Sequence, residues 1–183
     1  MYITKILLSL SILVISLDAN VYDDFYRDLK NKNYFQACIS GKKIFNKNER
    51  DEKLLSVIGQ TCLKADYIYV AAMIQSRLRE SKDARNNAVV FSSIVLQKRL
   101  IYQFMHDNID ISTLALPISD HPLSHTFIAI RDKSYTLSSA SPKIISFKKD
   151  GKKYKVYIDF KAKGRVIIEE TDSKNKTITH RYL

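Results

Sequence analysis

Two cysteines are the residues whose chemistry this sequence predicts most directly. Neither Cys38 nor Cys62 lies in a local pattern that is typical of a catalytic cysteine. In a chain that leaves the cytoplasm, as the first residues of this one indicate, two cysteines favour a structural disulfide. We therefore predict a Cys38–Cys62 disulfide, and the alternative is a nucleophilic thiol with a histidine partner.

Two histidines form the second group that could carry chemistry. His121 and His125 have the spacing that places two side chains on one face of a helix, where they can share a metal ion. Pro122 follows His121 directly, and the glutamate that follows the first histidine of a zinc-protease helix is missing. We therefore predict a polar loop with no metal, no cofactor and no catalytic residue, and a protein that is not an enzyme.

A group of lysines surrounds the dipeptide Asp150-Gly151. Its members are Lys148, Lys149, Lys152, Lys153 and Lys155. Their summed potential would concentrate an anionic partner near this segment. The alternative is that the lysines keep the tip of a sheet soluble and prevent the pairing of exposed edges.

The composition excludes several classes of protein. The 183 residues include 30 Lys and Arg against 19 Asp and Glu, a net charge of +11, and 45% of the residues are hydrophobic. That hydrophobic share is too high for a disordered chain, and only four glycines argue against glycine-rich phosphate-binding loops. Basic residues outnumber acidic ones more strongly in residues 112–183 than in residues 20–111. We expect a globular chain whose C-terminal part carries most of the positive potential.

Residues 1–19 have the order of a secretory signal peptide. Lys5 precedes an uncharged apolar run over residues 6–17, and the small Ala19 follows before Asn20. The run is too short to cross a bilayer as a helix, which needs about 20 apolar residues. We predict cleavage after Ala19 and a periplasmic location, which disfavours nucleic acid as a partner. The alternative is a leader that is kept as an anchor.

Apolar residues recur at helical spacing from residue 20 to about residue 111. Leu55, Ile58 and Cys62, for example, follow one another at intervals of three and four residues. The predicted helices cover residues 21–31, 34–46, 50–63, 67–80 and 86–106. Because short polar breaks separate them, neighbouring helices should pack as antiparallel hairpins. We therefore expect a helical-hairpin domain over residues 20–111.

Residues 33–80 resemble a tetratricopeptide-type repeat. Ile58-Gly59 matches the apolar-glycine pair of the first helix of such a repeat, and Ala71 matches the small residue of the second helix. Tyr34 and Ala37 resemble the aromatic and alanine step of a preceding unit. The resemblance implies paired antiparallel helices that bind a segment of a partner protein on a concave surface.

The pattern changes to the two-residue period of β-strands within residues 112–183. Val156 and Ile158 share one face of a strand, while Lys155 and Tyr157 share the other. Asp150-Gly151 predicts a tight hairpin turn, and further turns are expected at residues 161–164 and 171–176. We expect four strands in an antiparallel meander over residues 112–183, with an earlier hairpin formed by residues 126–130 and 134–138.

These patterns together predict an α+β protein, with N-terminal antiparallel helical hairpins followed by a C-terminal antiparallel β-meander. The leader, the helical spacing and the lack of a catalytic pattern favour an exported, non-enzymatic protein–protein interaction or scaffold protein of the cell envelope. The alternative is an envelope-binding module, whose basic hairpin contacts anionic lipid or polysaccharide at the periphery of a membrane.

Overall fold

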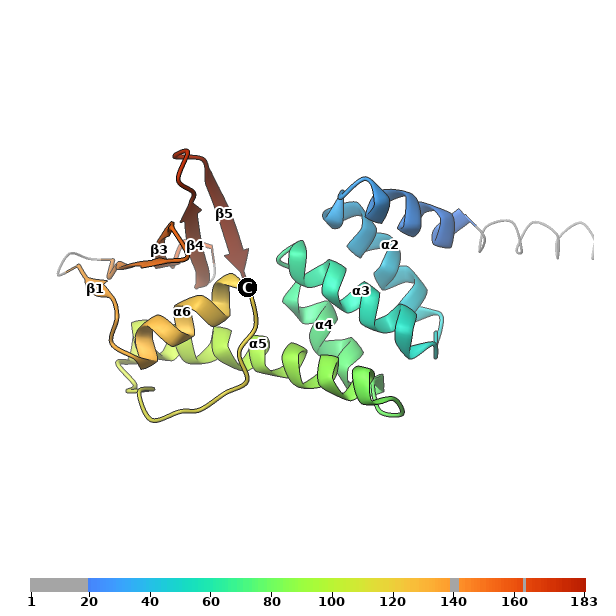
Figure 1. The fold of residues 1–183 in the computed structure, drawn as a ribbon, viewed down its shortest axis with the longest axis horizontal. Coiled ribbons are helices and arrows are strands. Elements are labelled where there is room, and N and C mark those ends of the chain that lie inside the picture. The colour runs from blue at the N-terminus through green and yellow to red at the C-terminus, as the bar shows by residue number, and fades with distance from the viewer. Residues whose placement is uncertain (1–19, 139–141, 163) are drawn as a thin grey trace, which may run out of the picture. The chain divides into compact units, whose positions relative to one another are not determined.

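The computed structural model describes residues 20–138, 142–162 and 164–183 (Figure 1). The leader expected over residues 1–19 lies outside these described residues. Helices precede an antiparallel sheet, which confirms the predicted α+β class. The chain divides into two compact units, residues 1–85 and residues 86–183. This boundary lies earlier than the change at residues 111 and 112 expected from the sequence.

The described part of the first unit is helical. Residues 20–30 are helical, and α2 (Tyr34–Asn46), α3 (Glu52–Lys64), α4 (Ile68–Ile74) and the short 3₁₀ helix η1 (Gln75–Arg77) follow. α3 packs against both α2 and α4. The predicted helices agree with these bounds to within a few residues, except that the fourth one was expected to continue to residue 80.

α2 and α3 lie unusually close together at Gly41. A Cβ atom on this residue would lie 2.7 Å from Cγ2 of Ile58 and 3.3 Å from Cε2 of Phe25, so no larger residue fits without a shift. The predicted disulfide between Cys38 and Cys62 joins the same two helices. Close packing and a covalent bond therefore hold α2 on α3.

Glu52 determines how the chain turns after η1. Its carboxylate accepts hydrogen bonds from the backbone N–H groups of three consecutive residues. The donors are Arg79, Glu80 at 2.7 Å and Ser81 at 3.0 Å. These bonds hold the pKa of Glu52 at about 2. The Ser81 hydroxyl accepts a bond from the Ala84 N–H at 3.1 Å and so caps the next helix, α5 (Lys82–Asp107).

Most of α5 belongs to the second unit, and buried Gln97 explains why. Its amide Nε2 donates to the carbonyl of Pro117 at 2.9 Å, and its Oε1 accepts from the Ser124 hydroxyl at 2.7 Å. These bonds tie α5 to the connection and the helix that follow it. Within the described part of the chain, neither α5 nor any other helix combines the length and apolar character that a membrane crossing requires.

The second unit contains a helix that the sequence analysis missed, α6 (Pro122–Arg131). The hairpin expected over residues 126–130 and 134–138 is therefore wrong for its first strand. Pro122 occupies the first turn of the helix, where its missing N–H costs nothing. Leu123, Phe127 and Ile130 are buried at helical spacing, and this burial overrides the strand preference of the β-branched residues between them.

The sheet contains five antiparallel strands in sequence order. They are β1 (Thr136–Leu137), β2 (Ile145–Lys149), β3 (Lys152–Asp159), β4 (Arg165–Thr171) and β5 (Thr177–Tyr182). This order confirms the predicted meander, and β1 lies within residues 134–138, the second strand of the earlier hairpin that was expected. Asp150 and Gly151 form the predicted turn between β2 and β3, with φ values of 50° and 74°.

The sheet has a covered face and an outward face. α6 packs against β4 on the covered face (Figure 1), where Val156, Val166 and Ile168 are fully buried. Tyr154 lies on this face as well, since its hydroxyl lies 3.1 Å from Nδ1 of His125 on α6. We call the opposite side the outward face. The alternation of strand residues assigns every lysine of the β2–β3 hairpin to one face or the other.

Candidate functional site

The five lysines predicted to bind an anionic partner do not form one patch. Lys148, Lys153 and Lys155 lie on the outward face of the sheet, because they alternate with the covered residues of β2 and β3. Lys149 and Lys152 lie on the covered face, in register with each other. The hairpin therefore carries its charge in two opposite directions.

Three of these lysines have a carboxylate partner. The pairs are Lys149 with Asp150 at 3.6 Å, Lys152 with Glu170 at 2.6 Å and Lys155 with Glu169 at 3.6 Å. The hydrogen bond to Glu170 raises the pKa of Lys152 above its usual value. Glu169 also accepts a bond from the Tyr157 hydroxyl at 3.0 Å, so its carboxylate is engaged on both oxygens.

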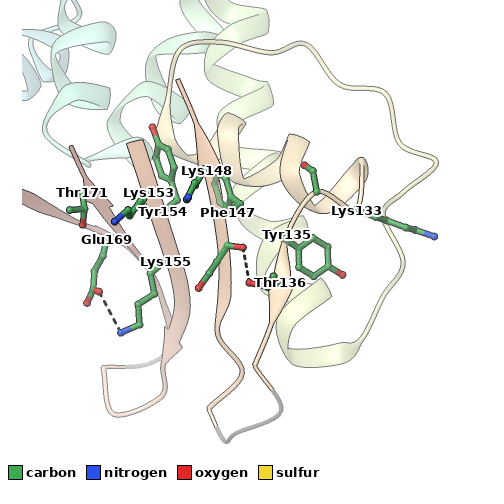
Figure 2. Close-up of a pocket in the computed structure, with 12 residues that line it drawn as sticks. Lys133, Tyr135, Thr136, Phe147, Lys148, Lys153, Tyr154, Lys155, Glu169 and Thr171 are labelled. Atoms are coloured by element: carbon green, nitrogen blue, oxygen red, sulfur yellow. Dashed lines mark hydrogen bonds and ion pairs between the residues drawn. The ribbon is translucent and has the colours of Figure 1, made fainter. Parts of the chain in front are cut away.

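Lys148 and Lys153 have no ion-pair partner among the residues that the structure describes. They are direct cross-strand partners on β2 and β3. Both line a hollow of about 700 Å³ on the outward face, which Figure 2 shows with the Lys155–Glu169 pair at one side. We call it the sheet hollow. Hydroxyl-bearing side chains line it too, namely those of Ser134, Tyr135, Thr136, Ser146 and Thr171.

A second hollow, of about 320 Å³, lies in the helical unit between α2 and α4. We call it the α2–α4 groove. Its lining residues are Cys38, Ile39, Lys42, Lys43, Asn46, Tyr67, Tyr69 and Val70, and none of them is acidic. Tyr69 leaves 45% of its surface exposed. The groove therefore combines an accessible aromatic ring with positive charge.

Aromatic contacts order one wall of the α2–α4 groove. The ring of Tyr67 lies 5.5 Å from that of Phe35 and 5.7 Å from that of Tyr69, measured between centroids. The ammonium of Lys42 lies 5.0 Å from the centre of the Tyr69 ring and donates to its hydroxyl at 3.0 Å. This arrangement holds a cation and three rings in fixed positions.

The two histidines take structural positions around the start of α6. His121 is the residue before the helix, and its Nδ1 accepts a hydrogen bond from the Leu123 N–H at 3.2 Å. His125 lies one turn further on, between Asp120 at 3.2 Å and the Tyr154 hydroxyl at 3.1 Å. Burial lowers the pKa of His125. In the part of the chain that the structure covers, no three ligand-type side chains gather into a metal centre.

The α2–α4 groove was not predicted from the sequence. One signal could have identified it. Phe35 and Tyr69 fall between the buried positions of α2 and α4, and such large rings outside an apolar helix face indicate an accessible surface.

Comparisons with models of protein families, with curated proteins and with solved structures find no match to this chain. The resemblance to tetratricopeptide-type repeats therefore stays a prediction.

Proposed function

We propose that this protein is an exported, non-enzymatic binding protein of the cell envelope, and that its helical unit holds an acidic segment of a partner protein. The observation that carries the proposal is the α2–α4 groove, with the exposed ring of Tyr69, its lysines and its lack of carboxylates. The disulfide supports a place outside the cytoplasm, because such bonds persist in oxidising compartments. Cleavage after Ala19 and a periplasmic location belong to the same proposal.

The lining of the groove explains why an acidic segment is the occupant. Lys42 and Lys43 attract carboxylates, and no acidic residue of this chain lines the groove to compete for them. Tyr69 supplies a rigid ring that an apolar side chain of the segment can cover, as aromatic anchors do at many interfaces. The occupant that fits best is thus a segment with acidic residues beside an apolar one.

The packing of the helical unit also supports a binding surface built on paired helices. Ala37 and Ala71, the two small positions of the tetratricopeptide-type resemblance, are both fully buried. The disulfide fixes α2 on α3, and α4 packs on the same α3. Both walls of the groove therefore stand on one support, which reduces the ordering that a bound segment must impose.

Site-specific crosslinking in the envelope tests this proposal. A photoreactive phenylalanine analogue replaces Tyr69 in the groove or, as the control, Val57, an exposed residue of α3 that does not line it. We expect a discrete adduct from position 69 only, and an acidic segment of the partner in the crosslinked peptide. Adducts from both positions, or from neither, would contradict the proposal.

Binding of the crosslinked segment, made as a synthetic peptide, gives the second measurement. Lys42→Glu with Lys43→Glu should weaken its binding, measured by fluorescence anisotropy, by roughly tenfold or more, because two attractive charges become repulsive. Lys30→Glu with Lys32→Glu changes the net charge equally outside the groove and should leave affinity within a factor of about two. Equal losses in both variants would refute a specific groove.

A further inference from the structure

Two lysines that face each other in the sheet hollow lower the stability of the folded sheet when no ligand is bound. Lys148 and Lys153 face each other across β2 and β3, where opposite Cβ atoms lie about 4.5–5.5 Å apart. Like charges in this position destabilise a sheet. A carboxylate nearby would remove the conflict, but Glu169 already bonds to Lys155 and Tyr157. The two ammonium groups therefore lack a counter-charge within the hollow.

The side chains around the pair are suited to a hydroxylated ligand. Thr171 lies opposite Lys153 on β4, and Ser146 lies opposite Lys155 on β2. Thr136 adds its hydroxyl from β1, where it donates to the Ser146 carbonyl at 3.2 Å. Hydroxyls both donate and accept, so they match a ligand that carries hydroxyl groups of its own.

From these observations we propose that the sheet hollow binds a carboxylate-bearing polysaccharide chain, with Lys148 and Lys153 as the residues that hold its carboxylates. The pair supplies the charge, and the surrounding hydroxyls supply hydrogen bonds to the sugar. No aliphatic side chain lines the hollow and the Phe147 ring beside it is buried, so the hollow offers little apolar surface to lipid tails, which a membrane-docking surface requires. This site lies in the second unit and does not depend on the α2–α4 groove.

The test uses polygalacturonate as the probe, with uncharged dextran as a comparison and phosphatidylglycerol vesicles as the membrane alternative. Lys148→Gln with Lys153→Gln should weaken the binding of polygalacturonate by roughly tenfold, because the two positive charges that attract its carboxylates are lost. Lys149→Gln with Lys174→Gln removes equal charge outside the hollow and should change affinity by less than about twofold. Binding should also fall steeply as salt is raised.

Thr171→Glu provides an independent variant that keeps both lysines. Its carboxylate would stand opposite Lys153 and compete with the polysaccharide, so binding should again fall by roughly tenfold. Melting temperatures separate binding from folding. Removing Lys148 and Lys153 should leave the melting temperature unchanged or raise it, since the repulsion disappears.

Several results would overturn the inference. Polygalacturonate that binds no better than dextran would do so, and so would equal losses in the two lysine double variants. Binding to the vesicles alone would instead assign the surface to a membrane. None of these results bears on the crosslinking at Tyr69, so the proposals for the sheet hollow and for the α2–α4 groove are tested separately.

Discussion

Glu52 contributes to stability through its carboxylate, which accepts hydrogen bonds from three consecutive backbone N–H groups. The pKa falls from 4.5 to about 2 in the folded protein. A lowered pKa means that the folded state favours the ionised group, so the stabilisation is complete above about pH 4.5 and is lost as pH falls toward 2. Glu52→Gln should therefore lower the melting temperature at neutral pH, and the difference from the unmodified protein should shrink near pH 2.

Glu80→Gln is the matched control, because Glu80 is an exposed carboxylate of the same loop. Its side chain should contribute little, so its melting curve should follow that of the unmodified protein at each pH. A Glu52→Gln variant that melts normally at neutral pH would show that the loop does not depend on this carboxylate.

The charges of the β2–β3 hairpin could be predicted only in part from the sequence. The Asp150-Gly151 turn predicts that Lys148 faces Lys153, since a two-residue turn fixes the register of both strands. Which lysines are neutralised depends on Glu169 and Glu170, whose partners follow only from the pairing of β3 with β4. The sequence therefore predicts the basic hairpin, while the unpaired lysines emerge only from the assembled sheet.

At the level of elements, the disulfide between α2 and α3 is the feature most open to measurement. It closes a loop between two residues that are 24 positions apart. In the chain-entropy description, this restriction of the unfolded chain stabilises the folded state by about 3 kcal/mol. We expect Cys38→Ser with Cys62→Ser to lower the melting temperature as much as reduction of the unmodified protein does. Reductant should then have no effect on the double variant. The prediction would be contradicted if the oxidised protein, the reduced protein and the double variant all melted at the same temperature.

The elements themselves could be predicted to different degrees. Apolar periodicity predicts the helices around Leu55 and Ile58 and the strands around Val156. Each of these elements buries one apolar face, so its own stretch of sequence carries the periodic pattern. α6 was missed because Pro122 was interpreted as a break, although proline is favoured in the first turn of a helix. The end of η1 at Arg77, short of the expected residue 80, was missed as well, since the residues that follow it bond to Glu52 from a different helix.

At the level of the whole molecule, export determines which partners the two hollows can meet. Expressed with its leader, the protein should be recovered from the periplasm with the mass of residues 20–183, because we predict cleavage after Ala19. Thiol titration of the denatured protein should find no free thiol, since both cysteines are in the disulfide. Deletion of residues 6–17 is the control and should leave a cytoplasmic protein with two reduced thiols. An intact leader on an internal, reduced protein would refute the assignment.

The two units offer different chemistry to a partner. The helical unit presents aromatic rings with lysines at Tyr69, and the second unit presents lysines among hydroxyls at Lys148 and Lys153. A protein with two such surfaces suits a role in which a protein and a polymer are bound by one chain.

The adjacency of Glu169 and Glu170 on β4 has a consequence for how this strand can change in length. Neighbouring strand residues point to opposite sides, so one glutamate neutralises Lys155 and the other neutralises Lys152. An insertion or deletion of one codon that shifts the register of β4 would exchange their directions and separate both ion pairs. A change of one residue in the length of this strand should therefore be tolerated only where a β-bulge absorbs it.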